Sequence, residues 1–182
     1  ALIGDRYDVM TQSSFSIPSV PETGKTFEEN ALIKANEVSK KTGLLTIADD
    51  SGLEVDLLEG KPGVYSARYA GPDATDTENN NKLLMELEKF KDEIITARFK
   101  SVIVIVDPLD DSKNIFDGSW EGQIIFNPRG KNGFGYDPIF YIESLESTAG
   151  ELKQVEKNKL SHRAIAMRKV TNYLKKKTFA TE

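Results

Sequence analysis

The chain has 182 residues, of which 38% are hydrophobic and 29% charged, and its net charge is −5. This composition is typical of a globular domain and excludes the collagen-like, coiled-coil and disordered classes. There is no cysteine and a single histidine, His162, which excludes disulfides, thiolate catalysis and a metal site built from several histidines of this chain. No apolar stretch reaches 18 residues, so we expect no membrane partner.

The charge is unevenly distributed. Residues 151–182 carry nine Lys and Arg against three Glu, a net charge of +6, which leaves −11 on the remainder. A basic segment beside an acidic body suits an anionic substrate bound with a divalent cation, although a solvated helix face explains the same charges. The acidic overall balance argues against a nucleic-acid partner, because such proteins need a clear basic footprint.

The first third of the chain predicts a loop, a helix and a short strand. Residues 12–26 form a Ser-, Pro- and Thr-rich loop that ends in a capping-box pattern at 26–29. The spacing of the apolar residues predicts a helix over 27–42, and Gly43 ends it. Residues 44–48 predict a short buried strand that leads into a polar turn at 49–52.

The rest of the chain alternates helices and strands. The expected elements are a turn at 60–63, a helix at 76–90, a hairpin of strands 97–106 and 114–126, a glycine-rich loop at 130–137, a strand at 138–142, and a helix capped by Ser161 that runs to about residue 177. Such interleaving predicts an α/β or mixed α+β fold with a mixed sheet, organised as one domain.

Carboxylates mark a first candidate site. Asp49 and Asp50 are adjacent and therefore point in opposite directions, so that one can face a cleft. Carboxylates are ligands that Mg²⁺ prefers, and one beside a bound water can accept its proton. Glu22, in a loop before a helix, is a second candidate metal ligand, and Lys34 is placed to reach phosphate. The alternatives are an ordinary Asp-rich turn and a solvated lysine.

Two further segments carry groups that suit a planar ligand. In the glycine-rich loop, Phe134 and Tyr136 could stack on a base and Asp137 could accept from a ring N–H. Alternatively, these aromatic rings simply fill the core. Lys157, together with residues 161–163 at the start of the last helix, offers donors to anions or carbonyl oxygens. Helix capping and a surface pair would explain those residues equally.

Five segments occur in a fixed order: ETGKTFEENA (22–31), ADDSGL (48–53), PGVYSARYAG (62–71), GFGYDPIF (133–140) and SHR (161–163). Together they closely resemble the inosine triphosphate pyrophosphatase family, also called dITP/XTP pyrophosphatases, from about residue 1 to residue 175. The resemblance implies hydrolysis of ITP, dITP and XTP to the monophosphate and pyrophosphate with Mg²⁺, which cleanses the nucleotide pool. It also implies an elongated, two-lobed fold with a cleft, a homodimer and a cytoplasmic location.

The resemblance also implies roles for individual residues. Asp50 matches the proton acceptor and a metal ligand, and Glu22 matches the other metal ligand. The matching substrate-binding residues are Lys34, Ser51, Phe134, Gly135, Tyr136, Asp137, Lys157, His162 and Arg163. Family members begin with a strand and a Thr/Ser-Gly-Asn-x-x-Lys phosphate loop. No such motif occurs here, so we expect residues 1–182 to form a single two-lobed domain without that segment.

Two other functions remain open at this point. One is a related pyrophosphatase acting on modified pyrimidine triphosphates, although the Ser-His-Arg and Phe-Gly-Tyr-Asp segments are not characteristic of those enzymes. The other is a protein without catalytic activity that binds nucleotides or serves as a dimerisation module. A dimerisation module would leave Glu22 and Asp50 without a shared purpose.

Overall fold

A computed structural model describes residues 7–177 of the chain. Its helices and strands are α1 (Phe27–Thr42), β1 (Thr46–Val55), α2 (Asp76–Leu87), β2 (Ile95–Asp107), β3 (Ser112–Ile124), β4 (Phe140–Ile142), β5 (Ser147–Thr148), α3 (Gln154–Leu160) and α4 (His162–Lys176). Short 3₁₀ turns include η4 (Gly63–Arg68) and η6 (Asp137–Ile139). The expectation about an initial strand and phosphate loop concerns the start of the chain, which lies outside the described residues.

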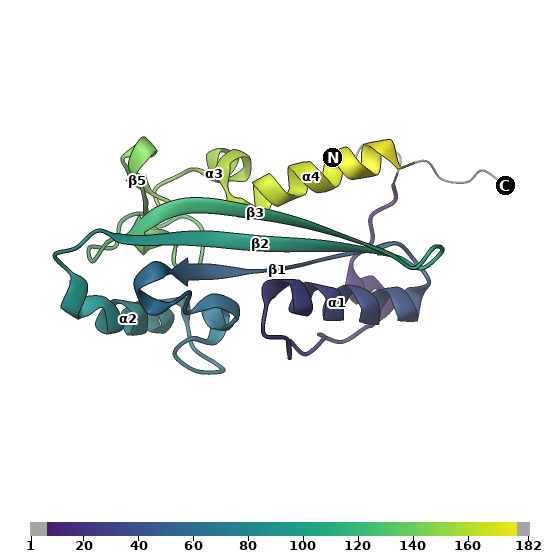
Figure 1. Ribbon diagram of the computed structural model, residues 1–182, viewed down its shortest axis with the longest axis horizontal. Helices are drawn as coiled ribbons and strands as arrows, with labels where there is room; N and C mark the ends of the chain where they lie inside the picture. The colour runs from purple at the N-terminus through teal and green to yellow at the C-terminus, as the bar shows by residue number, and fades with distance from the viewer. Residues whose placement is uncertain (1–6, 178–182) are drawn as a thin grey trace.

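The five strands form one sheet in the order β1-β2-β3-β4-β5, and helices cover both of its faces (Figure 1). The predicted combination of a central sheet with flanking helices is confirmed. The prediction of a mixed sheet is wrong for residues 7–177, because all neighbouring strands there are antiparallel. The reason is that the segment containing α2 leaves β1 and returns to β2 at the same end of the sheet, where Val55 pairs with Ala97.

β2 lies between two layers of helices, which bury both of its faces. Figure 1 shows α1 and α4 on opposite sides of the sheet. Valines of β2 pack against α1, and isoleucines of β2 pack against α4. The first cluster comprises Phe27, Ala31, Ala35, Val102, Val104 and Val106, and the second comprises Ile103, Ile105, Ala166, Val170 and Leu174. Burying each such side chain contributes roughly 1.5–3 kcal/mol, so the two helices are held firmly on opposite faces.

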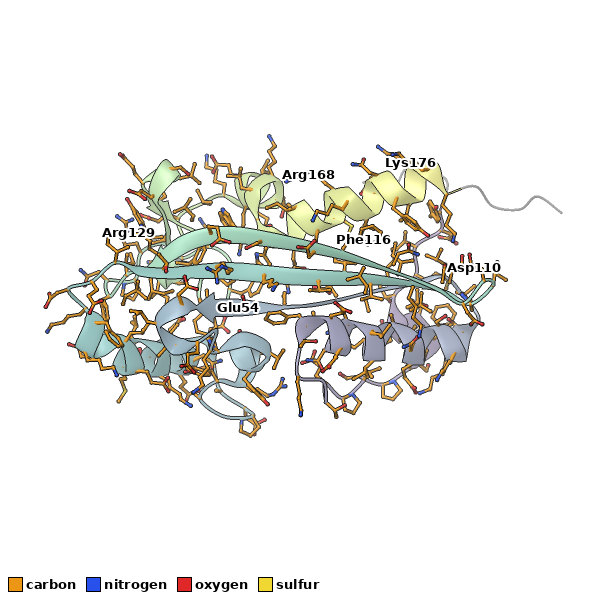
Figure 2. The ribbon with its side chains drawn as sticks, viewed as in Figure 1. Glu54, Asp110, Phe116, Arg129, Arg168 and Lys176 are labelled. Atoms are coloured by element: carbon orange, nitrogen blue, oxygen red, sulfur yellow. The ribbon has the colours of Figure 1, made fainter. Side chains whose placement is uncertain are left out.

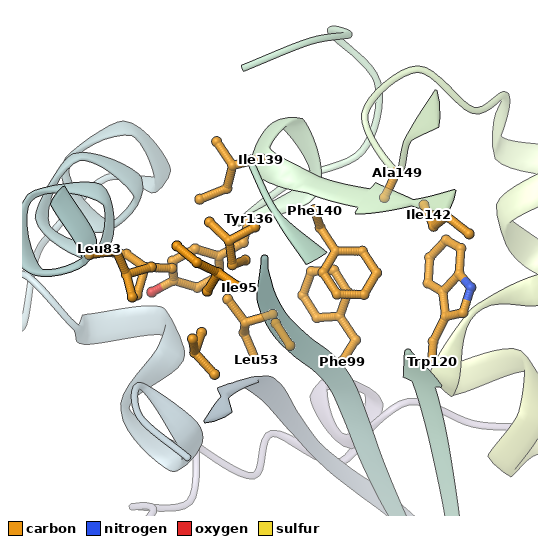
Figure 3. Packing of buried hydrophobic residues seen from close by; sticks show 14 of the residues in the cluster. Leu53, Leu83, Ile95, Phe99, Trp120, Tyr136, Ile139, Phe140, Ile142 and Ala149 are labelled. Carbon is orange, nitrogen blue, oxygen red and sulfur yellow. The ribbon is translucent and has the colours of Figure 1, made fainter. Parts of the chain in front are cut away.

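A third and larger apolar cluster fixes α2 and the glycine-rich loop at the other end of the sheet (Figure 3). The Phe99 and Phe140 ring centroids lie 4.5 Å apart, and the Trp120 and Phe140 centroids 5.6 Å apart. Leu83 of α2 and Tyr136 of the loop belong to the same cluster. The segments that flank the candidate site therefore share one rigid core.

Local signals predicted several boundaries correctly. α1 spans the expected residues, and the Thr26 hydroxyl accepts a hydrogen bond from the Glu29 N–H at 3.1 Å. The hairpin of β2 and β3 and the helix at 76–90 are also confirmed, the latter as α2 with a short 3₁₀ extension. The last helix begins after Ser161, whose hydroxyl accepts from the Ala164 N–H at 3.3 Å.

Two strand boundaries differ from the prediction. β1 continues to Val55, so residues 49–52 lie inside a strand and not in a turn. β1 pairs residue by residue with β2 from Thr46 to Val55, and this ladder overrides the weak β-propensity of Asp, Ser and Gly. At 138–142 only Phe140–Ile142 is strand, because a 3₁₀ turn precedes it.

Within residues 7–177, no helix is long and apolar enough to cross a membrane.

Candidate active site

The alternation of β1 sends its polar side chains to both faces of the sheet. Asp50 points to α1, where it contacts Asn30 and Lys34, whereas Asp49 points to α4 and contacts Arg163. In Figure 2, Glu54 of β1 lies on the α1 side of the sheet, and Phe116 of β3 lies on the α4 side, where it packs against the α4 cluster. The expectation that the two adjacent carboxylates diverge is confirmed.

A cluster of acidic and basic side chains surrounds Asp50. The Lys34 ammonium lies 3.0 Å from Glu22 Oε1 and 3.1 Å from Asp50 Oδ1, so one cation bridges both carboxylates. Arg68 Nη1 lies 3.2 Å from the other oxygen of Glu22. Residues from a loop, a helix, a strand and a 3₁₀ turn therefore meet at one place, which we call the acid cluster (Glu22, Lys34, Asp50 and Arg68).

Asn30 joins the loop of Glu22 to β1. Its Nδ2 donates to Asp50 Oδ2 at 3.1 Å, and its Oδ1 accepts from the Gly24 N–H at 2.7 Å. Asn30 and Lys34 are four residues apart on α1 and therefore share one helix face. Because Asn30 is fully buried, both hydrogen bonds are shielded from water. The helix thus sets the separation of Glu22 and Asp50.

Burial and neighbouring charges shift the pKa values of this cluster in different directions. Burial raises the pKa of Asp50 above its ordinary value, and contacts with Lys34 and Asn30 offset only part of that rise. Burial also raises the pKa of Glu22, but Lys34 and Arg68 outweigh it, so the net shift is downward. The pKa of Lys34 is raised, because Glu22 and Asp50 more than offset the effect of its burial. The pKa values of the two carboxylates are therefore shifted in opposite directions, that of Asp50 upward and that of Glu22 downward.

The acid cluster has a donor set that fits a hard divalent cation. Two carboxylates from different elements already hold one cationic group, the Lys34 ammonium, between them. Across the described part of the chain, no group of three or more acidic or histidine side chains is arranged to hold a metal. Mg²⁺ commonly binds through one or two carboxylates plus substrate phosphates. Glu22 and Asp50 thus fit a metal that phosphate oxygens help to hold.

A pocket of about 160 Å³ lies next to this cluster along β1. It brings together all the predicted substrate-binding residues except Lys34. These are Ser51, Phe134, Gly135, Tyr136, Asp137, Lys157, His162 and Arg163. Pockets that enclose a drug-sized ligand hold roughly 300–1,000 Å³, so this one suits a single ring system rather than a whole nucleotide. We call it the base pocket.

Phe134 and two cations form one wall of the base pocket. The Phe134 ring is 61% exposed, with the Lys157 ammonium 4.6 Å and the Arg163 guanidinium carbon 5.5 Å from its centroid. Lys157 is buried against Asp137 in a close ion pair, and Asp137 also accepts from the Phe134 N–H at 2.8 Å. Phe134 is thus an exposed aromatic ring with two cationic donors over it.

Tyr136, unlike Phe134, belongs to the hydrophobic core. It is 3% exposed and donates its hydroxyl hydrogen to the Ser66 carbonyl at 2.9 Å. The alternative that loop aromatics fill the core therefore describes Tyr136, although its edge still lines the pocket.

His162 is buried at the start of α4 and lines the base pocket. Its ring stacks on Phe99 with centroids 5.0 Å apart, and neither ring nitrogen has a hydrogen-bond partner among the described residues. Burial, with further contributions from Arg163 and Lys157, lowers the pKa of His162 to about 3. Its approach to the sheet depends on Gly118, since a Cβ there would lie 2.2 Å from the His162 carbonyl oxygen. The imidazole is therefore neutral, with unpaired nitrogens beside a pocket.

Sequence reasoning assigned no role to Asn30 or Arg68, although both lie inside or beside the acid cluster. Both belong to segments that carry the family resemblance, and the four-residue spacing of Asn30 and Lys34 on one helix face was a usable signal. Lys34 lies with the acid pair and not in the base pocket. The role of each of these residues in the reaction stays a prediction.

Comparisons with known proteins agree with this geometry. Residues 2–173 match the model of the Ham1 family. The chain is 52% identical over 165 residues to a dITP/XTP pyrophosphatase of Vibrio cholerae, covering 90% of this chain and 82% of that protein. A dITP/XTP pyrophosphatase of Bacillus licheniformis is 53% identical over 157 residues, which cover 86% of this chain and 80% of that one.

Solved structures give the same answer. A HAM1 protein from Coxiella burnetii superposes with a TM-score of 0.92 and 47% identity over 97% of this chain and 90% of that chain. A Ham1 protein from Staphylococcus aureus superposes with a TM-score of 0.89 and 42% identity, covering 96% of this chain and 90% of that one. The family that the ordered motifs predicted is thus confirmed by sequence and by structure, and this chain belongs to the Ham1 family.

Proposed function

We propose that this protein hydrolyses the non-canonical purine nucleoside triphosphates ITP, dITP and XTP to the monophosphate and pyrophosphate. One observation carries the proposal: two consecutive residues of β1 belong to the two halves of the site. Asp50 lies in the acid cluster, and Ser51 lines the base pocket. The two side chains point to opposite faces of the sheet, but β1 is its edge strand within residues 7–177, so a nucleotide with its base in the pocket would bring its phosphates around this edge to Glu22 and Asp50. The names of the Vibrio and Bacillus relatives support the same substrate class.

In the proposed reaction, water attacks the α-phosphorus and pyrophosphate leaves. Asp50 orients that water and accepts its proton, a role that its raised pKa favours because a more basic carboxylate is a better proton acceptor. Lys34 and Arg68 bring positive charge to the place where the phosphates would lie. Glu22 and Asp50 would hold Mg²⁺, which when bound supplies neutralisation of the phosphate charge.

Base selection would depend on hydrogen-bond donors at the pocket wall. Hypoxanthine and xanthine present a 6-oxo acceptor, whereas adenine presents a 6-amino donor. Lys157 and Arg163, which both lie beside the Phe134 ring, are donors only. They would pair with the 6-oxo group and oppose the adenine amine, and a buried mismatched polar group costs about 1–3 kcal/mol. The neutral His162 can donate from one nitrogen and accept at the other.

The basic charges of α4 are used within the fold. Lys169 pairs with Asp117 at 2.7 Å, and Lys177, just after the helix, pairs with Asp107 at 2.8 Å. These pairs reduce the basic surface that a nucleic acid would need.

We further propose a homodimer and a cytoplasmic location, as the family resemblance implies. Light scattering on the purified protein measures the first of these.

A substrate panel tests the proposed function. Purified protein is incubated with ITP, dITP, XTP, ATP or dTTP and Mg²⁺, and released pyrophosphate is quantified. We expect hydrolysis of the first three and little of the last two. Preference for dTTP would favour the pyrimidine alternative, and nucleotide binding without pyrophosphate release would favour a non-catalytic role.

A further inference from the structure

The glycine-rich loop is tied to α2 through the backbone of a single residue, Gly135. Its N–H donates to Asp76 Oδ2 at 2.6 Å, and its carbonyl accepts from Asn80 Nδ2 at 3.0 Å. Asp76 and Asn80 are four residues apart, on one face of α2. Both polar groups of one peptide residue are therefore held by side chains 55 and 59 positions away in the sequence.

α2 is a firm support for this contact. A capping box between Thr75 and Glu78 orders its first turn, where Asp76 lies. Asn79, which is buried, accepts from the Ala70 N–H at 2.7 Å and donates to the Ala67 carbonyl at 3.1 Å. Leu83 belongs to the same core cluster as Tyr136. The helix is thus also fixed by contacts outside the loop that it holds.

Gly135 adopts the left-handed region with φ +61°, which costs a glycine no strain, but glycine has more backbone freedom than other residues, so contacts are needed to hold it in one conformation. It stands between Phe134, whose exposed ring forms a wall of the base pocket, and Tyr136, which is buried in the core. A change in the Gly135 backbone would therefore redirect Phe134, while Tyr136 stays anchored. Apart from the Gly135 contacts, the Phe134 backbone is held by two hydrogen bonds to Asp137: its N–H donates to Asp137 Oδ2 at 2.8 Å, and its carbonyl accepts from the Asp137 N–H at 3.3 Å.

We propose that Asp76 and Asn80 are positioning residues for base recognition: they fix the Gly135 backbone so that Phe134 presents its ring to the base. This inference rests on the proposed function of the pocket. It makes α2, which contributes no residue to the acid cluster, a determinant of affinity for the purine. Asp76 also lines the base pocket whereas Asn80 does not, so the Asn80 variant isolates the clamp from direct contact with the base. Loosening this clamp acts on base binding and leaves the attack at phosphorus unchanged.

The test compares KM with kcat for ITP in Asp76→Ala, Asn80→Ala and the double variant. Each single substitution removes one hydrogen bond to Gly135, so we expect KM to rise about five- to tenfold while kcat stays within about twofold. The double variant should show a KM increase smaller than the product of the single increases, because both side chains hold the same residue. The dissociation constant of IMP, measured by calorimetry, should rise in parallel.

Two controls separate positioning from general damage to the fold. Asp76→Asn keeps an acceptor oxygen and should restore most of the ITP affinity. Asn81→Ala, at an exposed neighbour on the same helix, should leave KM unchanged. Unchanged KM in both single variants, or a fall in kcat at constant KM, would overturn the clamp. Failure of the wild-type protein to hydrolyse ITP or XTP would instead overturn the proposed function, which the substrate panel shows directly.

Discussion

Replacing Asp50 by Asn separates catalysis from stability. In the structure, Asp50 Oδ1 lies 3.1 Å from the Lys34 ammonium and Oδ2 accepts from Asn30 at 3.1 Å, with only 10% of the side chain exposed. Asparagine has nearly the same shape, so it can occupy the same space. It lacks the negative charge and the basic lone pairs that a proton acceptor needs. We therefore expect turnover to fall about 10²–10⁴-fold, the usual effect of losing a general base.

The expected change in stability is the balance of two opposing effects. Burial raises the pKa of Asp50 in the folded protein, so Asp50 contributes stability at low pH, and this contribution is lost as pH rises through its folded pKa. At pH 7 the buried ionised carboxylate costs free energy, which a neutral amide does not. Lys34 keeps its partner Glu22 in the variant. The amide must, however, turn its NH₂ group toward either the Lys34 ammonium or Asn30 Nδ2, which are both donors, and such a mismatch costs about 1–3 kcal/mol. Because this cost opposes the gain from removing the buried charge, we expect the free energy of unfolding at pH 7 to change by no more than about 2 kcal/mol.

The assay measures pyrophosphate release from ITP at saturating Mg²⁺, together with urea unfolding of the same samples. Asp117→Asn is a matched control, because Asp117 is also a strand carboxylate paired with a lysine, 2.7 Å from Lys169, but is far more exposed. The control should keep wild-type turnover. If Asp50→Asn retains more than about a tenth of the turnover, the assignment of Asp50 as proton acceptor is wrong. If Asp50→Asn unfolds, the expectation that removing the buried charge offsets the lost contacts is wrong.

Three further substitutions act on other parts of the site. Glu22→Gln should raise the Mg²⁺ concentration that gives half-maximal activity, and equal Mg²⁺ dependence would contradict a shared metal site. Arg163→Ala should lower the ratio of kcat/KM for ITP to kcat/KM for ATP, and an unchanged ratio would indicate that Lys157, not Arg163, discriminates between the two bases. His162→Gln should remove the loss of stability that protonation of this histidine causes at low pH. The pKa of His162 is about 3 in the folded protein and about 6.5 in the unfolded chain, so its burial should lower the free energy of unfolding between pH 6.5 and pH 3, by about 2 kcal/mol from pH 7 to pH 5. Urea unfolding at the two pH values measures this, and equal losses in both proteins would contradict it.

Local chemistry in the sequence was sufficient for the boundaries of α1, α2, α4 and the hairpin of β2 and β3. Thr26 and Ser161 accept the cap hydrogen bonds that their position before an apolar periodic segment predicts. β1 could not be delimited this way, because its length depends on its pairing with β2. The antiparallel sheet was equally hidden, since the place where α2 returns to the sheet is a property of the whole fold.

Much of the candidate site was predicted, but not how it is divided. The resemblance selected the residues that line the base pocket, and the two carboxylates meet at one ammonium as a shared metal site requires. The positions of Asn30, Lys34 and Arg68 between and around those carboxylates depend on tertiary contacts among four segments. Asp76 and Asn80 were missed because their partner is a backbone group, which leaves no trace in side-chain chemistry.

The register of β1 is what couples the two halves of the site. Asp50 lies opposite Val102 of β2, which packs against α1, and Asp49 lies opposite Ile103, which packs against α4. A slip of one residue would exchange these faces and move Asp50 away from Lys34. The apolar clusters on both faces of β2 oppose such a slip, because it would expose or crowd both at once. The core that stabilises the sheet therefore also keeps Asp50, the proposed proton acceptor, in the acid cluster and Ser51 in the base pocket.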